Sequence, residues 1–169
     1  MRIQERLLQC KLELHPEKTR IVYCKDDNRR YGYPNESFVF LGYSFSPRKA
    51  QNRFGRRFVC FSPAVSRKAA KKMHCEMRGW RFHLRSGTSL GDLARISNPI
   101  LRGWINYYGQ YYKSALYRVF SVFNRILIRW ARRKYKRFRF HQRRAAHWLR
   151  RIARQQPGLF AHWEKGFRP

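Results

Sequence analysis

The chain has 169 residues, 43% of them hydrophobic and 17% aromatic, so it can bury a core and is not simply a disordered basic tail. Its 39 Lys and Arg residues outnumber its 9 Asp and Glu residues and give a formal net charge of +30, which would repel a compact fold from itself unless a polyanion neutralised it. Nucleic acid is the obvious polyanion. Lys or Arg interrupts every long apolar run, so no stretch approaches the ~18 apolar residues of a spanning helix, and we expect no membrane partner.

The first third of the chain predicts a short helix followed by a small antiparallel β element. Residues 2–12 place leucines at helical spacing, and residues 19–24 predict a strand. Residues 38–45 predict a further strand, in which Gly42 marks a point where the backbone comes close to another group. Residues 57–61 are its expected hairpin partner.

From Ser62 onward the apolar period changes from two to nearly four, which predicts helices. The first covers residues 62–79. A second helical region covers residues 90–109 and is expected to break or change direction at Asn98-Pro99. A basic helix is expected at residues 139–154.

The helix predicted for residues 112–135 has the clearest pattern in the chain. Five large apolar residues recur at steps of four and three, which at about 100° per residue puts them on one stripe: Leu116, Phe120, Phe123, Leu127 and Trp130. Five basic residues fall on the opposite side: Arg118, Arg125, Arg129, Arg132 and Lys136. This helix therefore has one face for a core and one for phosphates. The chain as a whole predicts an α+β fold, with a small antiparallel β element followed by a mainly α-helical bundle.

The four cysteines are widely spaced and form no C-x-x-C pair: Cys10, Cys24, Cys60 and Cys75. This spacing favours neither a zinc site nor a disulfide framework. His74, Cys75 and Glu76 are neighbours in sequence, and neighbours do not share a helix face. We therefore expect no metal ligands.

Three blocks of the sequence resemble a known family. Residues 12–19, LELHPEKT, resemble the sixth motif of reverse transcriptases, and residues 38–45 resemble the seventh. Residues 98–109, NPILRGWINYYG, resemble the maturase-specific region of group II intron reverse transcriptases, which is called domain X or the thumb. Residues 159–163 resemble the ending of bacterial members that lack an endonuclease domain.

The resemblance implies a C-terminal fragment of such a protein. Residues 1–61 would be the end of the palm, residues 62–138 the thumb or domain X, and residues 139–169 a basic helical tail. The partner implied is group II intron RNA, whose splicing and mobility the protein would assist, with a DNA target as a further partner. The implied location is the bacterial cytoplasm, with the RNA or the nucleoid.

The resemblance also implies roles for single residues. Lys18 stands where the family places a lysine near the phosphates of the incoming nucleotide, and Leu41, Gly42 and Tyr43 stand where the primer terminus is held. The family's metal-binding carboxylates lie before the first matching block, in a Tyr-x-Asp-Asp turn and an earlier Asp. We therefore expect no catalytic residue, no enzyme activity of the chain on its own, and no cofactor, since Mg²⁺ would belong only to a complete polymerase. Residues 23–27 contain Asp26-Asp27, but their spacing is one residue too long.

Binding is the activity that the residues themselves predict. Lys and Arg neutralise phosphates, and the candidates are Arg67, Lys71, Lys72, Arg102, Arg118, Arg125, Arg129, Arg132, Arg133 and Lys136. Aromatic side chains stack on unpaired bases of structured RNA, and Tyr108 and Tyr112 are the preferred candidates among a group that also contains Trp104, Tyr107, Tyr111 and Trp148.

Three alternatives to an RNA-binding maturase domain stay open. The chain could complete an RNA-directed DNA polymerase together with a separately encoded fingers-palm fragment. It could be a remnant of a mobile element without function. It could also be an unrelated basic RNA-binding protein, such as a ribosomal protein, although the order of the three blocks argues against that.

Overall fold

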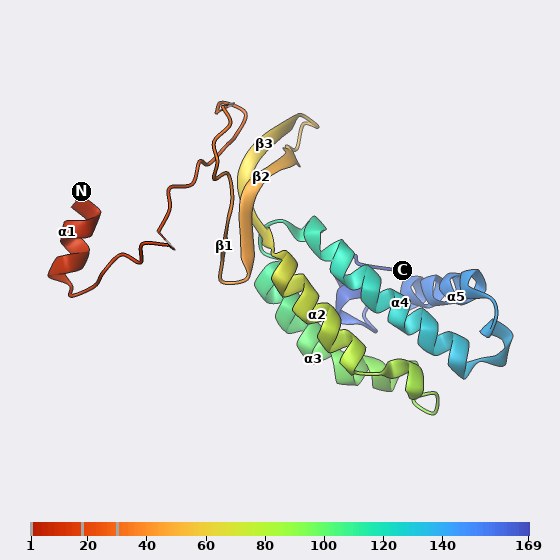
Figure 1. Ribbon diagram of the computed structural model, residues 1–169. Helices are drawn as coiled ribbons and strands as arrows, with labels where there is room; N and C mark the ends of the chain where they lie inside the picture. The colour runs from red at the N-terminus through yellow and green to blue at the C-terminus, as the bar shows by residue number, and fades with distance from the viewer. Residues whose placement is uncertain (1, 18, 30) are drawn as a thin grey trace. The chain divides into compact units, whose positions relative to one another are not determined.

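The computed structural model describes residues 2–17, 19–29 and 31–169 (Figure 1). Its strands and longer helices are α1 (Arg2–Gln9), β1 (Phe38–Phe40), β2 (Tyr43–Gln51), β3 (Arg57–Val65), α2 (Arg67–Gly79), α3 (Leu90–Tyr108), α4 (Leu116–Lys134), α5 (Gln142–Gln155) and α6 (Ala161–Glu164). Three one-turn 3-10 helices join them: η1 (Phe82–Leu84), η2 (Lys113–Ala115) and η3 (Lys136–Phe138). A three-stranded sheet of order β1-β2-β3 lies between α1 and the remaining helices, which confirms the α+β class.

The chain divides into two compact units. The first contains Met1–Phe38 and Ser46–Phe61, and the second contains Val39–Phe45 and Ser62–Pro169. The second unit, which we call the helical unit, holds the turn between β1 and β2 and every helix from α2 onward.

The first unit lacks the strand expected at residues 19–24. Residues 19–29 form no helix or strand, and their bonds to other segments include those from the Tyr23 N–H to the Asn35 carbonyl, at 2.8 Å, and from the Asp27 N–H to the Val59 carbonyl, at 3.3 Å. A strand needs a regular ladder of such bonds. The prediction was wrong because β-favouring side chains cannot by themselves supply a pairing partner.

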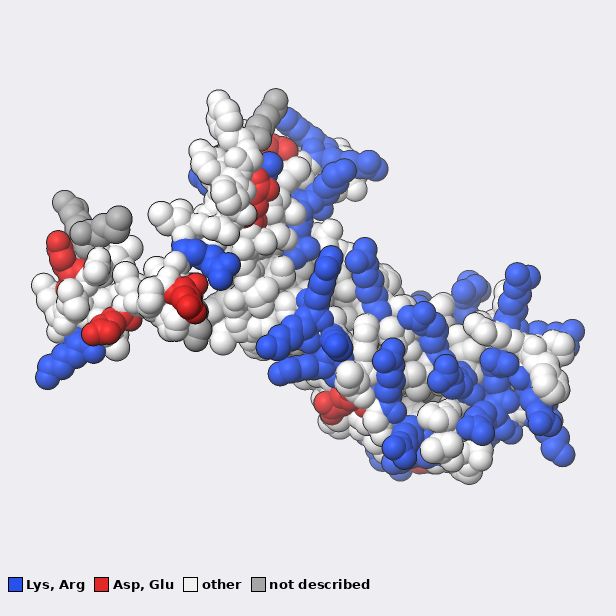
Figure 2. Space-filling model, viewed as in Figure 1, with Lys and Arg blue, Asp and Glu red and all other residues white. Residues whose placement is uncertain are grey.

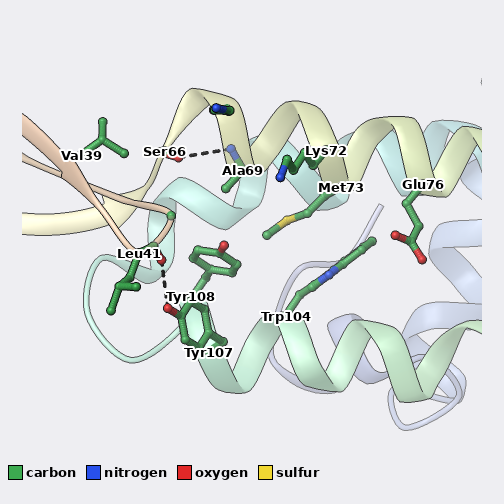
Figure 3. A pocket seen from close by; sticks show the side chains of 12 residues that line it. Val39, Leu41, Ser66, Ala69, Lys72, Met73, Glu76, Trp104, Tyr107 and Tyr108 are labelled. Atoms are coloured by element: carbon green, nitrogen blue, oxygen red, sulfur yellow. Dashed lines mark hydrogen bonds between the residues drawn. The ribbon is translucent and has the colours of Figure 1, made fainter.

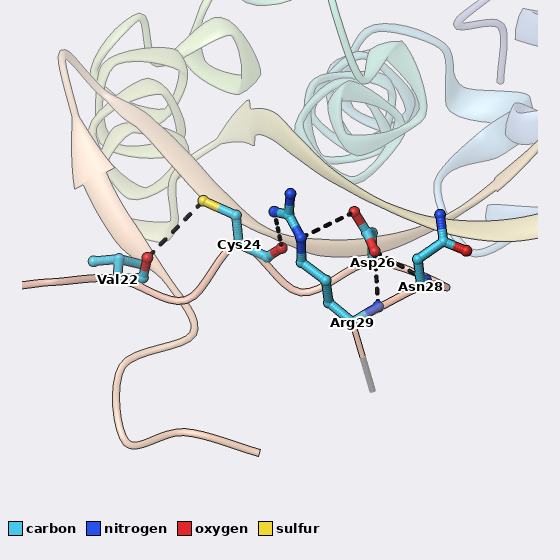
Figure 4. A network of polar contacts seen from close by, with 5 residues as sticks. All are labelled: Val22, Cys24, Asp26, Asn28 and Arg29. Carbon is cyan, nitrogen blue, oxygen red and sulfur yellow. Dashed lines mark hydrogen bonds and ion pairs between the residues drawn. The ribbon is translucent and has the colours of Figure 1, made fainter. Parts of the chain in front are cut away.

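Asp26 organises a turn in this unit (Figure 4). Its Oδ1 accepts hydrogen bonds from the backbone N–H groups of Asn28 and Arg29, both at 2.9 Å. The Arg29 guanidinium reaches back to the Cys24 carbonyl at 3.2 Å, and its Nε lies 3.9 Å from Asp26 Oδ2. An Asp side chain that bonds backbone N–H groups two and three residues ahead is a common local turn device.

The predicted strand at residues 38–45 is interrupted by a tight turn. Leu41 has φ 46° and Gly42 has φ 82°, so both central positions of the turn between β1 and β2 are left-handed. This backbone suits a two-residue hairpin, which reverses the chain where a single strand was expected. The close approach predicted at Gly42 is confirmed, because a Cβ there would lie 2.5 Å from the Tyr108 hydroxyl oxygen.

The core of the helical unit is built around α4. The five residues of the predicted apolar stripe are all fully buried, which confirms that stripe. Helix α4 packs against α2, α5 and the three 3-10 helices. The Phe123 ring contacts the rings of Trp80, Phe160 and His162 at centroid distances of 5.5, 5.8 and 5.1 Å.

A polar contact fixes the C-terminal segment on α4. Asn124 Oδ1 accepts from Trp163 Nε1 and lies 2.9 Å from His162 Nε2, while Asn124 Nδ2 donates to the Phe167 carbonyl at 3.1 Å. Burial lowers the pKa of His162 from its ordinary value to about 3. The imidazole is therefore neutral at physiological pH.

Helix α3 runs without interruption through Pro99, so the predicted break is absent. Its N-terminus has a capping box, in which Ser89 and Asp92 each bond the other's backbone N–H. Asn98, just before the proline, donates to the Leu159 carbonyl at 3.0 Å and accepts from the Ala161 N–H at 2.9 Å. These bonds hold the C-terminal segment against the middle of α3. No helix in the described part of the chain is long and apolar enough to cross a bilayer.

Candidate nucleic-acid interface

The helical unit carries a long stretch of chain without any carboxylate side chain. Residues 93–163 contain 17 Lys and Arg residues and no Asp or Glu. Figure 2 shows Lys and Arg side chains spread over the visible face of this unit. Asp92, at one end of the stretch, pairs with Arg95, and Glu164 adjoins the other end, but most of these cations have no carboxylate near them in sequence. Positive charge on this scale favours binding to a polyanion.

The outer face of α4 presents part of this charge. Arg118, Arg125 and Arg129 are exposed and lie opposite the buried stripe. Arg132 is half-buried, and its guanidinium donates to the Arg139 carbonyl through Nε at 3.3 Å and Nη2 at 3.1 Å. Arg132 therefore also holds the chain beyond α4, whereas the other three have side chains available to phosphates.

The positive field extends to α2. Burial lowers the pKa of His74, and the charges of Arg78 and Arg125 lower it further. Among the described residues, His74 Nε2 is a buried ring nitrogen without a hydrogen-bond partner. Because charges from both α2 and α4 lower the pKa of this one side chain, the two helices contribute to one region of positive potential.

A groove of about 690 Å³ lies in the helical unit, between α2, α3 and the turn between β1 and β2 (Figure 3). Lys68, Lys72 and Glu76 line it from α2 at steps of four residues, which places them on one side of that helix. Trp104, Tyr107 and Tyr108 line it from α3, and Figure 3 shows the rings of Trp104 and Tyr108 facing α2 while the Tyr107 hydroxyl points to Leu41. The groove can therefore offer ring faces to a base, ammonium groups to phosphates and one carboxylate to amino groups.

The turn closes one end of the groove with Val39, Leu41 and Gly42. Leu41 is 67% exposed although its backbone is left-handed, a conformation that costs a non-glycine residue free energy. Tyr43 is buried behind the turn, with its ring 5.3 Å from that of Tyr107 and 5.2 Å from that of Tyr108. Burial raises the pKa of Tyr43, and the neighbouring tyrosines raise it further, so its hydroxyl stays a hydrogen-bond donor.

Six of the residues selected from the sequence meet at this groove: Leu41, Gly42, Lys72, Trp104, Tyr107 and Tyr108. Tyr43 packs behind the turn that closes one end of the groove. Lys18 lies outside the described residues. The remaining candidates are distributed over the helical unit and do not line the groove: Arg67, Lys71, Arg102, Tyr112, Arg118, Arg125, Arg129, Arg132, Arg133 and Lys136.

Sequence reasoning missed Lys68 and Glu76. Their signal was present, since both are spaced by four residues from Lys72 along α2. What the sequence could not show is that this side of α2 faces Trp104 and Tyr108 on α3. No three His, Cys, Asp or Glu side chains come together as a metal site in the part of the chain that the structure describes.

Comparison with known proteins gave one result. The family model described as "Group II intron, maturase-specific domain" matches residues 70–156, just over half of the chain. The match includes most of α2 and all of α3, α4 and α5. Searches of curated proteins and of solved structures gave no match.

Proposed function

The chain belongs to the group II intron maturase-specific domain family, so its function is of the maturase type, and we propose that it acts by binding folded intron RNA through the groove and the outer face of α4. The observation that carries this proposal is the carboxylate-free stretch of residues 93–163, which gives the helical unit 17 cationic side chains in addition to the aromatic groove.

The proposed interface makes two kinds of contact with RNA. Arg118, Arg125 and Arg129 on α4 neutralise phosphates, which supplies affinity without reading sequence. The groove takes an unpaired base against the rings of Trp104 and Tyr108, because single-stranded loops and bulges are the parts of RNA whose bases are free to stack. A protein that binds the folded RNA more tightly than the unfolded RNA shifts the folding equilibrium of that RNA.

We propose further that the chain does not extend primers by itself. Two-metal nucleotidyl transfer needs carboxylates that hold two cations about 4 Å apart. The chain has one pair of adjacent carboxylates, Asp26-Asp27, and Asp26 Oδ1 already accepts two backbone hydrogen bonds within its own turn.

The exposed apolar side chains of the first unit support a second candidate function, completion of a polymerase with a separate fingers-palm protein. Ile3 and Leu8 of α1 are 72% and 58% exposed, and Ile21 is 90% exposed. Apolar side chains left in water suit a protein partner. Primer extension by the chain mixed with a fingers-palm protein, and by neither alone, would support this function.

The main proposal is tested with the full chain and a group II intron transcript, by filter binding and by splicing at low Mg²⁺ concentration. We expect tight binding that weakens by ~10³–10⁵ between 50 and 200 mM salt, as for ~6–10 phosphate contacts, and faster splicing with protein. A transcript of the same length and shuffled sequence is the control, and a DNA copy of the intron sequence tests a DNA target. Equal affinity for the intron and the shuffled transcript would contradict the proposal.

A further inference from the structure

A second depression in the helical unit lies on α5, where the proposed function assigns nothing. Its volume is about 290 Å³, at the low end for a ligand pocket. Arg144, His147, Trp148 and Arg151 line it from α5 at steps of three, one and three residues, so they share one helix face. Arg137 and Phe138 line it from η3.

Aromatic contacts fix the floor of this depression. The Trp148 ring lies 5.2 Å from the ring of Tyr135 and 5.6 Å from that of Phe138, measured between centroids. Phe138 is 7% exposed, and the Arg137 guanidinium lies over its ring at 4.7 Å. Trp148 is half-buried and held by two rings, so its side chain is already ordered. A planar group that stacks on it therefore loses little free energy to side-chain ordering.

The charge around this floor is entirely positive. Arg137, Arg144 and Arg151 are exposed, and no described carboxylate forms a salt bridge with them. Of the six residues that line the depression, three are arginines and one is a histidine. These guanidiniums are therefore available to an anionic ligand.

The aromatic floor and the arginines around it together favour one class of ligand. An acidic peptide would use the guanidiniums but leave Trp148 without a planar partner. A nucleotide uses both, because its base can stack on an indole and its flanking phosphates can each accept from an arginine. An unpaired nucleotide can turn its base face to Trp148, whereas a base pair held within a duplex has both faces covered by its neighbours.

We propose that the face formed by Arg144, His147, Trp148 and Arg151 is a second nucleic-acid site, which holds one unpaired nucleotide of a bound RNA. The inference rests on the proposed function only in taking RNA as the partner. Helix α5 packs on α4, whereas the groove lies between α2 and α3, so the two sites contact different parts of the RNA. Two linked contacts on one RNA raise its overall affinity beyond that of either contact.

The test uses the full chain and two stem-loop RNAs, one fully paired and one with a single bulged 2-aminopurine. We expect the chain to prefer the bulged RNA by about 5- to 150-fold, the range for stacking of one base, and to quench the 2-aminopurine fluorescence. Arg144→Gln with Arg151→Gln should weaken the preference, because the arginines hold the phosphates of the stacked nucleotide, and reduce the salt slope by about 1.4, as for two single-strand contacts. Both residues are exposed and Gln is a good helix former, so the fold should be unchanged by circular dichroism.

The control variant is Arg56→Gln with Arg57→Gln, which removes the same charge from exposed positions of the first unit, outside the depression, and should keep the preference. Lys68→Gln with Lys72→Gln removes two charges from the groove, so it should weaken binding of both RNAs and keep the preference between them. The inference would be overturned if the α5 variant and its control lost the preference equally, or if only the groove variant lost it. Equal affinity of the parent for both RNAs would also overturn it. If the parent binds neither RNA, the proposed function itself fails.

Discussion

Tyr43 and Tyr107 hold the turn between β1 and β2 against the end of α3 by crossed hydrogen bonds. The Tyr43 hydroxyl donates to the Tyr107 carbonyl, and the Tyr107 hydroxyl donates to the Leu41 carbonyl at 2.9 Å. Each residue therefore fixes the backbone next to the other. The left-handed turn, which forms one end of the groove, is positioned by a helix 64 residues later in the chain.

Gly42→Ala should destabilise the helical unit. The substitution places a Cβ at φ 82° and 2.5 Å from the Tyr108 hydroxyl oxygen, and the left-handed backbone alone costs about 1–2 kcal/mol. Urea unfolding followed by circular dichroism measures the change. Gly87→Ala is the control, because nothing lies within 4 Å of a Cβ there. Equal stability of the two variants would contradict the role of the turn.

Phe123→Ala should cost about 3–5 kcal/mol of unfolding free energy, enough to unfold a marginal domain. The side chain is fully buried among the rings of Trp80, Phe82 and Phe160, so its removal leaves a cavity. Arg125→Ala, on the exposed face of the same helix, should change stability by less than about 0.5 kcal/mol. Similar unfolding midpoints for both would show that the stripe is not the core.

Replacing Arg118, Arg125 and Arg129 together by Gln should leave folding intact and weaken RNA binding. Three lost phosphate contacts reduce the salt slope by about 2.1 for single strands and about 2.7 for a duplex. The control replaces the exposed Arg53, Arg56 and Arg57 of the first unit and removes the same charge. An unchanged slope in the α4 variant would mean that RNA binds another face.

Acid should destabilise the fold through His162. Its pKa in the folded protein, about 3, lies below the ordinary value, so the unfolded chain binds the proton first as pH falls. The contribution is complete above about pH 6.5 and decreases by about 1.4 kcal/mol for each pH unit below it, toward pH 3. Denaturant titrations at several pH values should show this loss in the parent and a weaker dependence in His162→Gln. If the unfolding free energies of the parent and the variant changed equally with pH, the burial of a neutral imidazole would be contradicted.

Asp26→Ala should leave RNA binding unchanged and shift only the stability of the first unit, because the carboxylate serves a local turn. Primer extension on an RNA template with Mg²⁺ should give no product with the pure parent chain or with the variant. Extension by the parent that disappears in the variant would show that Asp26 is catalytic.

The sequence predicted those features that depend on neighbours along the chain. The α4 stripe is one, since 3.6-residue periodicity alone places Leu116 to Trp130 on a single face. The turn at Leu41 was not predictable in this way, because a leucine rarely adopts a left-handed backbone and the tyrosines that hold it come from α3. The groove was missed for a similar reason. Lys68 and Trp104 become neighbours only through helix packing, which the order of residues does not reveal.

The stretch of residues 93–163 without a carboxylate also affects the protein when it is alone. Charges of one sign on a compact surface raise the free energy of the folded state, and a bound polyanion removes that repulsion. Any ligand that binds only the folded chain stabilises it in proportion to the logarithm of its concentration. The melting temperature should therefore rise with RNA concentration, and in the cell a shortage of RNA would leave more of the chain unfolded and open to proteases.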